Sequence, residues 1–275
     1  AAAKQQVVKK TSSVDVDRAR TDFAYFCDVV GDKPPAEHMQ LWHEHLYTHQ
    51  DSECLINIAG PNVDILAPRG SAKSTVLGLF TAWAIGIHAL NKKPLKILYI
   101  SYTVDVARPK SAAIKRIIED SKLYREIFPT VKIAKGINSN EYWSIDWKFA
   151  GIRSTGEEEF SLCCAGLKGA VTSKRSHLCI IDDAIKSADD IKNKDIRQAM
   201  EDNWNAVIVP TMFEGARAIC LGTRFRHDDI HSTTFLPSSG WKQIVQSAIT
   251  VDKEGEEISY WPDMWSLDYL GQRRR

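Results

Sequence analysis

The sequence lacks the features that mark membrane-spanning or disulfide-stabilised proteins. No apolar run reaches the roughly 18 residues that a membrane-spanning helix needs, and we find no secretory signal ahead of a cleavage site. Cysteine occurs six times, but no pair has C-x-x-C spacing, and most cysteines lie in apolar, strand-like runs. We therefore expect reduced core cysteines, no zinc site and no membrane partner, as in a cytosolic protein.

An excess of charge of either sign is also missing. The chain has 36 Lys and Arg against 35 Asp and Glu, a net charge of +1. This excludes a globally basic surface, although a protein can hold DNA with a few local basic loops. The candidates for such phosphate contacts are Lys92, Lys93, Lys186, Lys192 and Lys194. The alternative for these lysines is an ordinary solvated surface.

What the sequence does contain is an alternation of strand-like and helix-like segments. Its 275 residues are 44% hydrophobic, enough for one large or two small domains with a substantial core. Apolar runs predict strands over 62–66, 96–101, 177–182, 218–222 and 241–249, with meandering β structure over 141–165. Helical spacing predicts helices over 15–30 (with Asp15 as the cap), 36–49, 74–90, 104–120 and 191–207. Buried strands separated by helices indicate an α/β protein with a mostly parallel central sheet flanked by helices.

The segment 65–75 (ILAPRGSAKST) is the most informative part of the chain. A strand ends there, a tight loop follows, and Lys73-Ser74 begins a helix. Loop amides and a helix N-terminus bind phosphate in nucleotide sites, where the lysine reaches the β- and γ-phosphates and the serine ligates Mg²⁺. The match to G-x-x-x-x-G-K-[ST] is imperfect, because Ala67 and Ala72 occupy both glycine positions and alanine tolerates positive φ poorly. The alternative is a plain strand-to-helix turn with a solvated lysine.

A second motif follows further along the chain. The segment 177–183 (HLCIIDD) is an apolar strand that ends in two acids. Asp182 is placed to hold Mg²⁺ through its water shell, and Asp183 to polarise the attacking water. The side chain of Asp183 is one methylene shorter than the glutamate that many ATP-hydrolysing motors have at this second acidic position. The alternative is that Asp183 caps a following helix.

Together these motifs resemble the large terminase subunit of tailed bacteriophages. The resemblance is carried, in order, by 68–74 (PRGSAKS), 166–183 (GLKGAVTSKRSHLCIIDD), 221–225 (LGTRF) and 260–270 (YWPDMWSLDYL). These segments are similar to the family's phosphate loop, its glycine-rich lead into Walker B, its coupling motif and its tryptophan-proline segment. The resemblance implies a P-loop NTPase fold of the additional-strand (ASCE) type, with ATP and Mg²⁺ as cofactors.

The resemblance also implies roles for single residues. Gln40 corresponds to the glutamine that reads adenine, Arg69 to the arginine that senses the γ-phosphate, and Thr223 to the threonine that couples hydrolysis to movement. The nucleotide-binding set it implies comprises Gln40, Pro68, Arg69, Gly70, Ser71, Ala72, Lys73, Ser74 and Thr75, with Ser74 and Asp182 at the metal. For each of Gln40, Arg69 and Thr223 a purely structural surface or strand-end role is the alternative.

Arg175 is our candidate for an arginine finger that reaches a neighbouring subunit's ATP, with Arg153, Arg224 and Arg226 as competitors. A finger of this kind implies a homo-oligomeric ring. The family resemblance further implies double-stranded DNA, the portal and the small terminase subunit as partners. It places the protein in the host cell cytoplasm, on the procapsid during packaging.

The predicted organisation is a flexible segment over 1–14, an ATPase domain over 15–255, and over 256–275 the start of a linker towards an absent nuclease domain. We therefore expect the chain to hydrolyse ATP and to translocate double-stranded DNA, but not to cut it. Two other functions stay open. One is a helicase-like ATPase, which needs a second motor lobe. The other is a non-hydrolysing DNA-binding module with a degenerate nucleotide site, favoured by Ala67, Ala72 and Asp183.

Overall fold

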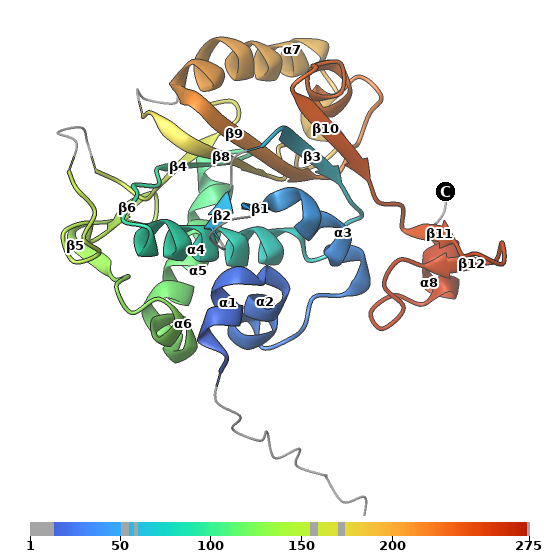
Figure 1. Ribbon diagram of the computed structural model, residues 1–275. Helices are drawn as coiled ribbons and strands as arrows, with labels where there is room; N and C mark the ends of the chain where they lie inside the picture. The colour runs from blue at the N-terminus through green and yellow to red at the C-terminus, as the bar shows by residue number, and fades with distance from the viewer. Residues whose placement is uncertain (1–13, 51–54, 58–59, 155–158, 170–173, 274–275) are drawn as a thin grey trace, which may run out of the picture.

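A central sheet of eight strands organises the part of the chain that the structure describes (Figure 1). The computed structural model describes residues 14–50, 55–57, 60–154, 159–169 and 174–273, so the predicted flexible segment 1–14 lies, except for Val14, outside the described residues. The strand order is β10-β3-β9-β8-β4-β7-β6-β5. The bounds are β3 Asn62–Leu66, β4 Ile97–Ser101, β5 Ile133–Asn138, β6 Tyr142–Ile145, β7 Leu162–Gly166, β8 Ser176–Asp182, β9 Met212–Gly222 and β10 Trp241–Val245.

The sheet is parallel from β10 to β7, and β6 and β5 extend it as an antiparallel pair. This confirms the predicted mostly parallel sheet. Strand β9 lies between β3, which leads into the phosphate loop, and β8, which ends in the two acids. A strand inserted at this place is the feature that defines the additional-strand subtype, so the subtype is confirmed as well. The carboxyl ends of β3, β8 and β9 meet at one edge, where ligands bind in open α/β sheets.

Helices cover both faces of the sheet (Figure 1). Those on one face are α1 Val16–Thr21, α2 Phe23–Gly31, α3 Glu37–Leu46, α4 Lys73–Leu90, α5 Val104–Asp120 and α6 Lys122–Ile127. On the other face lie α7 Lys194–Asn203 and two π-helical turns at Trp204–Ile208 and His231–Phe235. Alternate residues of β8 serve the two layers: Leu178 and Ile180 join the first cluster, and Cys179 and Ile181 the second. Period-two burial of a strand on both faces explains the nearly continuous apolar run that predicted it.

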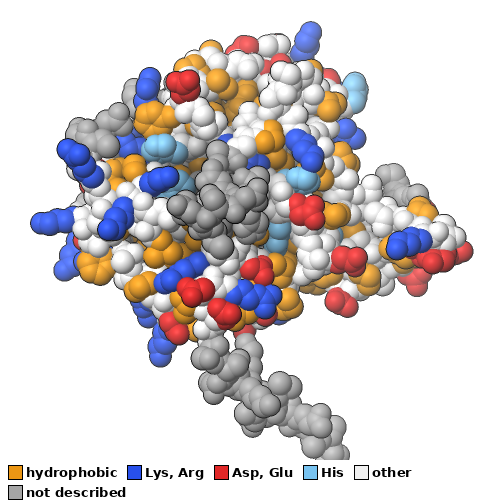
Figure 2. Space-filling view, viewed as in Figure 1, with side chains coloured by type: hydrophobic (Ala, Val, Ile, Leu, Met, Phe, Trp, Pro, Cys, Tyr) orange, Lys and Arg blue, Asp and Glu red, His pale blue; other side chains and the backbone are white. Residues whose placement is uncertain are grey.

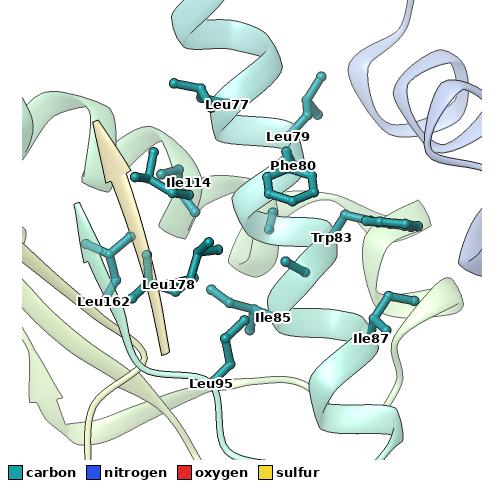
Figure 3. Packing of buried hydrophobic residues seen from close by; sticks show 14 of the residues in the cluster. Leu77, Leu79, Phe80, Trp83, Ile85, Ile87, Leu95, Ile114, Leu162 and Leu178 are labelled. Carbon is teal, nitrogen blue, oxygen red and sulfur yellow. The ribbon is translucent and has the colours of Figure 1, made fainter. Parts of the chain in front are cut away.

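Helix α4 runs through the middle of the larger core cluster (Figure 3). Ile85 lies towards Leu178 and Leu162 on the sheet, and Trp83 faces the opposite way, where its indole N–H donates to the Ala19 carbonyl at 3.0 Å. The helix has 18 residues with a mean hydropathy of 1.2, long and apolar enough to cross a membrane, but 72% of it is buried inside the protein. Its apolar character therefore belongs to the core.

Two predicted helices, 15–30 and 36–49, differ from their predicted extent. The predicted helix over 15–30 is wrong in its continuity, because Asp22 adopts an extended conformation and caps α2 by accepting from the Tyr25 N–H. Asp15 caps α1 as predicted, accepting from the Arg18 N–H. The predicted helix over 36–49 stops at Leu46, and a short strand, β1 (Thr48–Gln50), pairs with β2 (Leu55–Asn57).

The remaining differences from prediction lie away from the sheet centre. The helix predicted over 191–207 is a sequence of a 3₁₀ turn (Asp189–Ile191), α7 and a π-helical turn, followed by a 3₁₀ turn at Val209–Thr211. The predicted β structure over 141–165 consists of β6 and β7. The edge strand β5 was not predicted, because none of its side chains is buried and its sequence gives no apolar pattern. Of the six cysteines, Cys54 lies outside the described residues, and the other five are free thiols.

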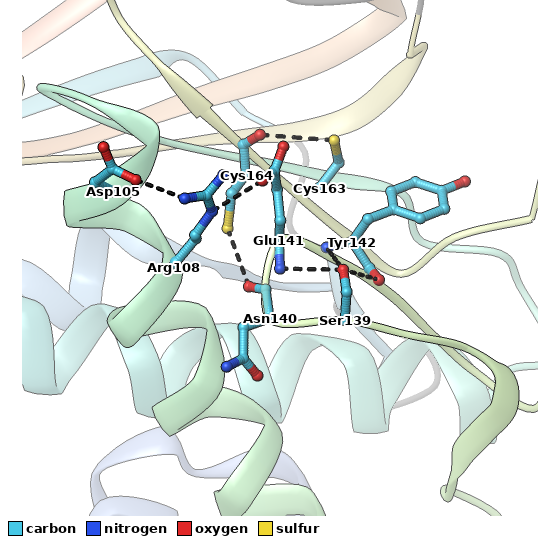
Figure 4. A network of polar contacts seen from close by, with 8 residues as sticks. All are labelled: Asp105, Arg108, Ser139, Asn140, Glu141, Tyr142, Cys163 and Cys164. Atoms are coloured by element: carbon cyan, nitrogen blue, oxygen red, sulfur yellow. Dashed lines mark hydrogen bonds and ion pairs between the residues drawn. The ribbon is translucent and has the colours of Figure 1, made fainter.

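A polar network fixes the antiparallel end of the sheet against α5 (Figure 4). Arg108 on α5 pairs with Glu141 at 2.6 Å and with Asp105 at 2.5 Å. The Cys164 thiol donates to the Asn140 carbonyl at 3.7 Å, so the β5–β6 connection is held from the helix and from β7.

The C-terminal part forms a separate projection beside the main sheet (Figure 1). Strands β11 (Ile249–Val251) and β12 (Glu257–Ser259) pair antiparallel, and α8 (Leu267–Gln272) follows. The predicted domain boundary at 255 falls in the turn between β11 and β12. Lys, Arg, Asp and Glu side chains are interspersed on the face seen in Figure 2, in keeping with the near-zero net charge.

Two glycines of α4 provide a matched test of this packing. A Cβ at Gly86 would lie 2.5 Å from the Phe128 ring, whereas a Cβ at Gly78 would meet only Ile114, at 3.7 Å. Replacing a helical glycine by alanine normally stabilises by about 1 kcal/mol. We expect Gly78→Ala to raise the melting temperature by a few degrees, and Gly86→Ala to lower it because overpacking costs roughly 1–3 kcal/mol. Thermal unfolding followed by circular dichroism measures both, and equal shifts would contradict the packing described here.

Candidate functional site

The two sequence motifs meet at the carboxyl edge of the sheet. The Ser74 hydroxyl, in the first turn of α4, donates to Asp182 Oδ1 at 2.9 Å. Asp182 is the last residue of β8, and Ser74 follows the loop that leaves β3. The predicted metal residues, 108 positions apart in the chain, are therefore in direct contact. Contact between a hydroxyl and a carboxylate at this place creates the oxygen-rich corner that Mg²⁺ prefers.

Asp182 is fully buried, with none of its surface exposed. Its Oδ2 accepts from the Tyr99 hydroxyl at 2.7 Å and forms an ion pair with Lys110 Nζ at 2.9 Å. The Ser101 hydroxyl donates to the Asp182 carbonyl at 2.7 Å. Burial, followed by the charge of Asp182, raises the pKa of Tyr99 well above 10.0, so its hydroxyl stays a donor.

Sequence reasoning missed Tyr99, Ser101 and Lys110. A signal for the first two existed, because both are polar residues at alternate positions of the otherwise apolar run 97–101, so their side chains lie on the same face of the strand. For Lys110, which is on α5, the sequence offered no comparable signal.

The phosphate loop closes around its own lysine. Lys73 is buried, and its Nζ donates to the Pro68 carbonyl at 2.8 Å, the Ala67 carbonyl at 3.2 Å and the Thr223 hydroxyl at 3.1 Å. The Thr223 hydroxyl in turn donates to the Ala67 carbonyl at 3.1 Å. Burial lowers the pKa of Lys73, against the opposing charges of Asp183 and Asp182. Thr223, predicted as the coupling residue, thus touches the loop directly.

The alanine that replaces the second loop glycine adopts the glycine conformation. Ala72 has φ 60° and ψ 25°, the left-handed region, and it serves as the N-cap of α4. Gly70 also has a positive φ, of 77°. The Ser71 hydroxyl donates to the Pro68 carbonyl at 2.8 Å and closes the turn. The loop therefore forms with the strain placed on Ala72, which costs about 1–2 kcal/mol for a residue with a Cβ.

The C-terminal projection reaches back to this loop. The Trp265 indole N–H donates to the Gly70 carbonyl at 3.3 Å. A Cβ at Gly70 would lie only 2.7 Å from the Trp265 ring. Gly70 is therefore required twice, for its backbone conformation and for this close approach.

Asp183 adopts an unusual backbone conformation beside the loop. Its φ is 52°, and its N–H donates to the Leu221 carbonyl of β9 at 3.0 Å. Burial raises the pKa of the Asp183 carboxyl, and the nearby charge of Lys73 opposes the rise. A carboxylate with a raised pKa is a better proton acceptor, as general-base chemistry requires.

Asp183 lines a cavity of about 340 Å³ with a strongly charged wall. The lining side chains that carry charge or hydrogen-bonding groups are Arg69, Tyr102, Lys110, Asp183, Lys186 and Thr223. Arg69 crosses this cavity: its guanidinium donates to the Lys186 carbonyl and lies 5.0 Å from the centre of the Phe225 ring. Three cations around one carboxylate make this cavity suited to a polyanionic ligand.

A second cavity, of about 610 Å³, lies between α3 and the C-terminal projection. Gln40 is exposed and lines it, as do His38 and Trp261. His38 Nε2 is 3.3 Å from the Ser71 carbonyl, and its ring lies 5.0 Å from the centre of the Trp261 ring. His38 therefore joins this cavity to the phosphate loop.

Other predicted residues lie on the surface or far from this site. Thr75 is exposed in the first turn of α4. Arg175 precedes β8 at the opposite edge of the sheet from Asp182, about 20 Å away at roughly 3.3 Å per strand residue. Its guanidinium lies 5.6 Å from the centre of the Phe213 ring. Arg224 and Arg226, which follow Thr223, line a separate cavity beside Phe225.

The five lysines proposed for DNA contacts are all exposed: Lys92, Lys93, Lys186, Lys192 and Lys194. Lys92 and Lys93 follow the end of α4, at the edge of the sheet opposite the phosphate loop, whereas the other three follow β8. They do not form one surface.

One member of a buried ionisable pair lies in the strand that leads into the phosphate loop. His231 Nδ1 lies 2.9 Å from Oδ1 of Asp64, in the middle of β3, and both side chains are fully buried. Gln243 donates to the other Asp64 oxygen at 2.9 Å. The ligand atoms of Asp64, Cys220 and His231 all lie within 4.8 Å of one another. Asp64 holds its neighbours through hydrogen bonds, so the grouping has a structural explanation without a metal.

Arg217 ties α3 to the sheet below the site. From β9 its guanidinium donates to the Pro61 carbonyl at 2.7 Å, to the Leu46 carbonyl at 3.0 Å and to the His45 carbonyl. These acceptors are the end of α3 and the residue just before β3. The helix that carries Gln40 and the strand that leads into the loop are thus fixed to one buried side chain.

Comparisons with known proteins find no matching family model and no matching curated protein. Among solved structures, the chain is similar to the ATPase domain of the large terminase of Thermus phage P74-26, in an arginine-to-alanine variant. The TM-score is 0.53 at 12% identity, covering 90% of this chain and 91% of that one. The N-terminal domain of the DNA-packaging ATPase from bacteriophage phi29 gives a TM-score of 0.39 at 16% identity, covering 75% of this chain and 93% of that one. The first likeness shows that this chain has the fold of the large terminase ATPase domain.

Relieving the strained alanine tests the loop geometry. We expect Ala72→Gly to raise the free energy of unfolding by about 1 kcal/mol, because glycine adopts the left-handed conformation without the Cβ penalty. Ala84→Gly, in the helical interior of α4, is the matched control and should lose stability, as glycine does in helices. Urea titrations measure both changes. A destabilised Ala72→Gly variant would show that the loop does not place residue 72 at positive φ.

The Asp64–His231 pair predicts a loss of stability on the alkaline side. Burial by itself lowers the pKa of His231, but the hydrogen bond and charge of Asp64 outweigh it, so the pKa is raised above 6.5. The stabilisation is complete below the unfolded-state value and is lost as pH rises through the folded-state pKa. We expect the urea midpoint of the wild type to fall as the pH rises above 6.5 into the alkaline range.

The control variants separate His231 from its neighbours. His231→Gln should flatten this pH dependence, and His227→Gln, four residues earlier and exposed, should leave it unchanged. The assignment is wrong if the wild type and His231→Gln have the same slope.

Proposed function

We propose that the chain is the ATP-hydrolysing motor domain of a viral DNA-packaging machine, driving double-stranded DNA into a procapsid. The contact between Ser74 and Asp182 carries this proposal, because it joins the phosphate-loop motif to the acidic strand end inside one site. The resemblance of four ordered sequence segments to large terminase subunits supports packaging over other uses of this fold.

Binding of ATP follows from the arrangement of the two cavities. The β- and γ-phosphates belong at the loop, where Lys73 and the amides of 69–74 converge with the N-terminus of α4. The adenine belongs in the cavity lined by Gln40, next to His38, which contacts the loop. Lys73 donates to two loop carbonyls and to Thr223, so its ammonium is already held where phosphate oxygens would accept hydrogen bonds from it.

The residues present fit a magnesium ion. The Ser74 hydroxyl and the Asp182 carboxylate offer oxygen ligands 2.9 Å apart at the end of the loop. When bound, Mg²⁺ neutralises charge that develops on the transferring phosphoryl group. Tyr99 and Ser101 hold Asp182 in place from β4, so the chain fixes the orientation of this carboxylate without the ion.

Hydrolysis requires a base and stabilisation of negative charge. Asp183, with its raised pKa, faces the cavity next to Thr223 and orients the attacking water while accepting its proton. Arg69 lies across the same cavity and contacts the γ-phosphate. Thr223 bonds to Lys73, so a change at the phosphates reaches β9 through one hydrogen bond.

Packaging also implies partners. We propose a homo-oligomeric ring on the portal, with the small terminase subunit, in the host cell cytoplasm. Arg175 lies at the edge of the sheet away from its own site, so in such a ring it would act only on a neighbour's ATP. The exposed lysines after β8 are the better candidates for DNA contacts, because they adjoin the catalytic edge.

Phosphate release from ATP, with and without DNA, is the direct test. We expect Lys73→Ala and Asp183→Asn each to lower turnover by about 100-fold or more, because each removes a charged group that acts in the transition state. Lys122→Ala, on the exposed start of α6, should retain wild-type turnover. Full turnover in Lys73→Ala would overturn the proposal.

The two rivals give different results in the same preparation. A non-hydrolysing module binds Mg·ATP but releases no phosphate, even with DNA and at concentrations that favour assembly. A helicase-like ATPase separates a forked duplex, whereas a packaging motor moves along an intact duplex without unwinding it. Displacement of a labelled strand distinguishes the last two.

A further inference from the structure

Asp182 has a cationic partner of its own within the chain. Lys110 Nζ lies 2.9 Å from Oδ2 and donates to the Asp182 carbonyl at 3.1 Å. The phosphate-loop lysine does not take this place, because Lys73 is engaged by Ala67, Pro68 and Thr223. A carboxylate with no exposed surface needs a compensating charge, and Lys110 supplies it.

The position of Lys110 conflicts with a metal at the same carboxylate. The Asp182 side chain receives Ser74 on Oδ1, and both Tyr99 and Lys110 on Oδ2. A divalent cation held by Ser74 and Asp182 would stand within a few ångströms of the Lys110 ammonium, where two positive charges repel strongly in a poorly solvated place. The two hydroxyl donors are neutral and can remain.

Lys110 has another anion to contact when it leaves the carboxylate. The residue lines the cavity that is also lined by Arg69, Asp183 and Thr223, and its side chain is 19% exposed. A lysine is a flexible point charge on a four-carbon stem, so it can turn from Asp182 into the cavity without movement of α5.

We propose that Lys110 and the divalent cation are alternative partners of Asp182, and that Lys110, once displaced, binds the terminal phosphate of the nucleotide in the neighbouring cavity. This inference rests on the proposed function and adds to it a positioning residue on α5. It makes occupation of the metal site and the arrival of a cation at the terminal phosphate a single event. Lys110 is thereby a counter-ion before binding and a phosphate contact after it.

The test uses the whole chain without nucleotide. Lys110→Met retains the length of the stem and removes the charge, leaving Asp182 buried without a counter-ion. In EDTA we expect its melting temperature to fall by about 5–10 °C. Added Mg²⁺ should restore most of this loss, whereas the wild type should respond little. Lys115→Met, on the same helix with its amine on Asn138, is the matched control and should match the wild type in both conditions.

Metal affinity provides the second readout. Mn²⁺ binding followed by electron paramagnetic resonance should be on the order of tenfold tighter in Lys110→Met than in the wild type, because the competing cation is gone. Lys110→Arg, which retains the charge, should bind Mn²⁺ as weakly as the wild type. Should Lys110→Met not fold in EDTA, its folding is measured again with Mg²⁺ present. Recovery of the folded state supports the exchange, and failure to recover it in Mg²⁺ counts against the exchange.

The outcomes separate this inference from the function on which it rests. A Lys110→Met variant as stable as the wild type in EDTA, or one whose loss Mg²⁺ does not restore, overturns the exchange and assigns Lys110 a purely structural place. Absence of ATP hydrolysis by the wild type sinks the proposed function but leaves these measurements without nucleotide intact. Unchanged Mn²⁺ affinity in Lys110→Met also counts against the exchange.

Discussion

The contact between Ser74 and Asp182 is the constraint on which the rest of the molecule depends. It requires the N-terminus of α4 and the end of β8 to meet, although the two residues are 108 positions apart in the chain. The parallel order β3-β9-β8 achieves this, because all three strands end at the same edge. Burial of Asp182 then sets the chemistry around it, since a carboxylate without water must be satisfied by protein groups. Tyr99, Ser101 and Lys110 are the groups that satisfy it.

Much of this arrangement was predictable because its signals are local. The strand over 62–66, the helix over 104–120 and the acidic strand end at 182–183 each follow from apolar spacing and a polar terminus within a few residues. Ala72 illustrates a weaker case. An alanine at this position argued against the phosphate loop, yet residue 72 has a positive φ in the structure. The stabilisation gained by packing α4 into the core exceeds the small cost of one strained alanine.

What could not be predicted depends on which strands are neighbours. Lys110 reaches Asp182 only because β4 lies beside β8, and nothing in the sequence around either residue states that order. Asp64 was a missed signal of another kind, since an acid in the middle of an apolar strand must find a buried partner, here His231. The division at Asp22 was missed because a capping side chain outweighed helical periodicity.

The three hydrogen bonds of Arg217 have a mechanical consequence. They hold the end of α3, the start of β3 and the strand β9 that leads to Thr223 in one rigid frame. Breaking these bonds would leave a buried guanidinium charge without these partners, which is costly. The helix that carries Gln40 and the strand that leads into the loop of Lys73 are therefore held at a fixed separation. Any movement at the site is therefore left to parts outside this frame, such as the turn that carries Asp183 or the helix that carries Lys110.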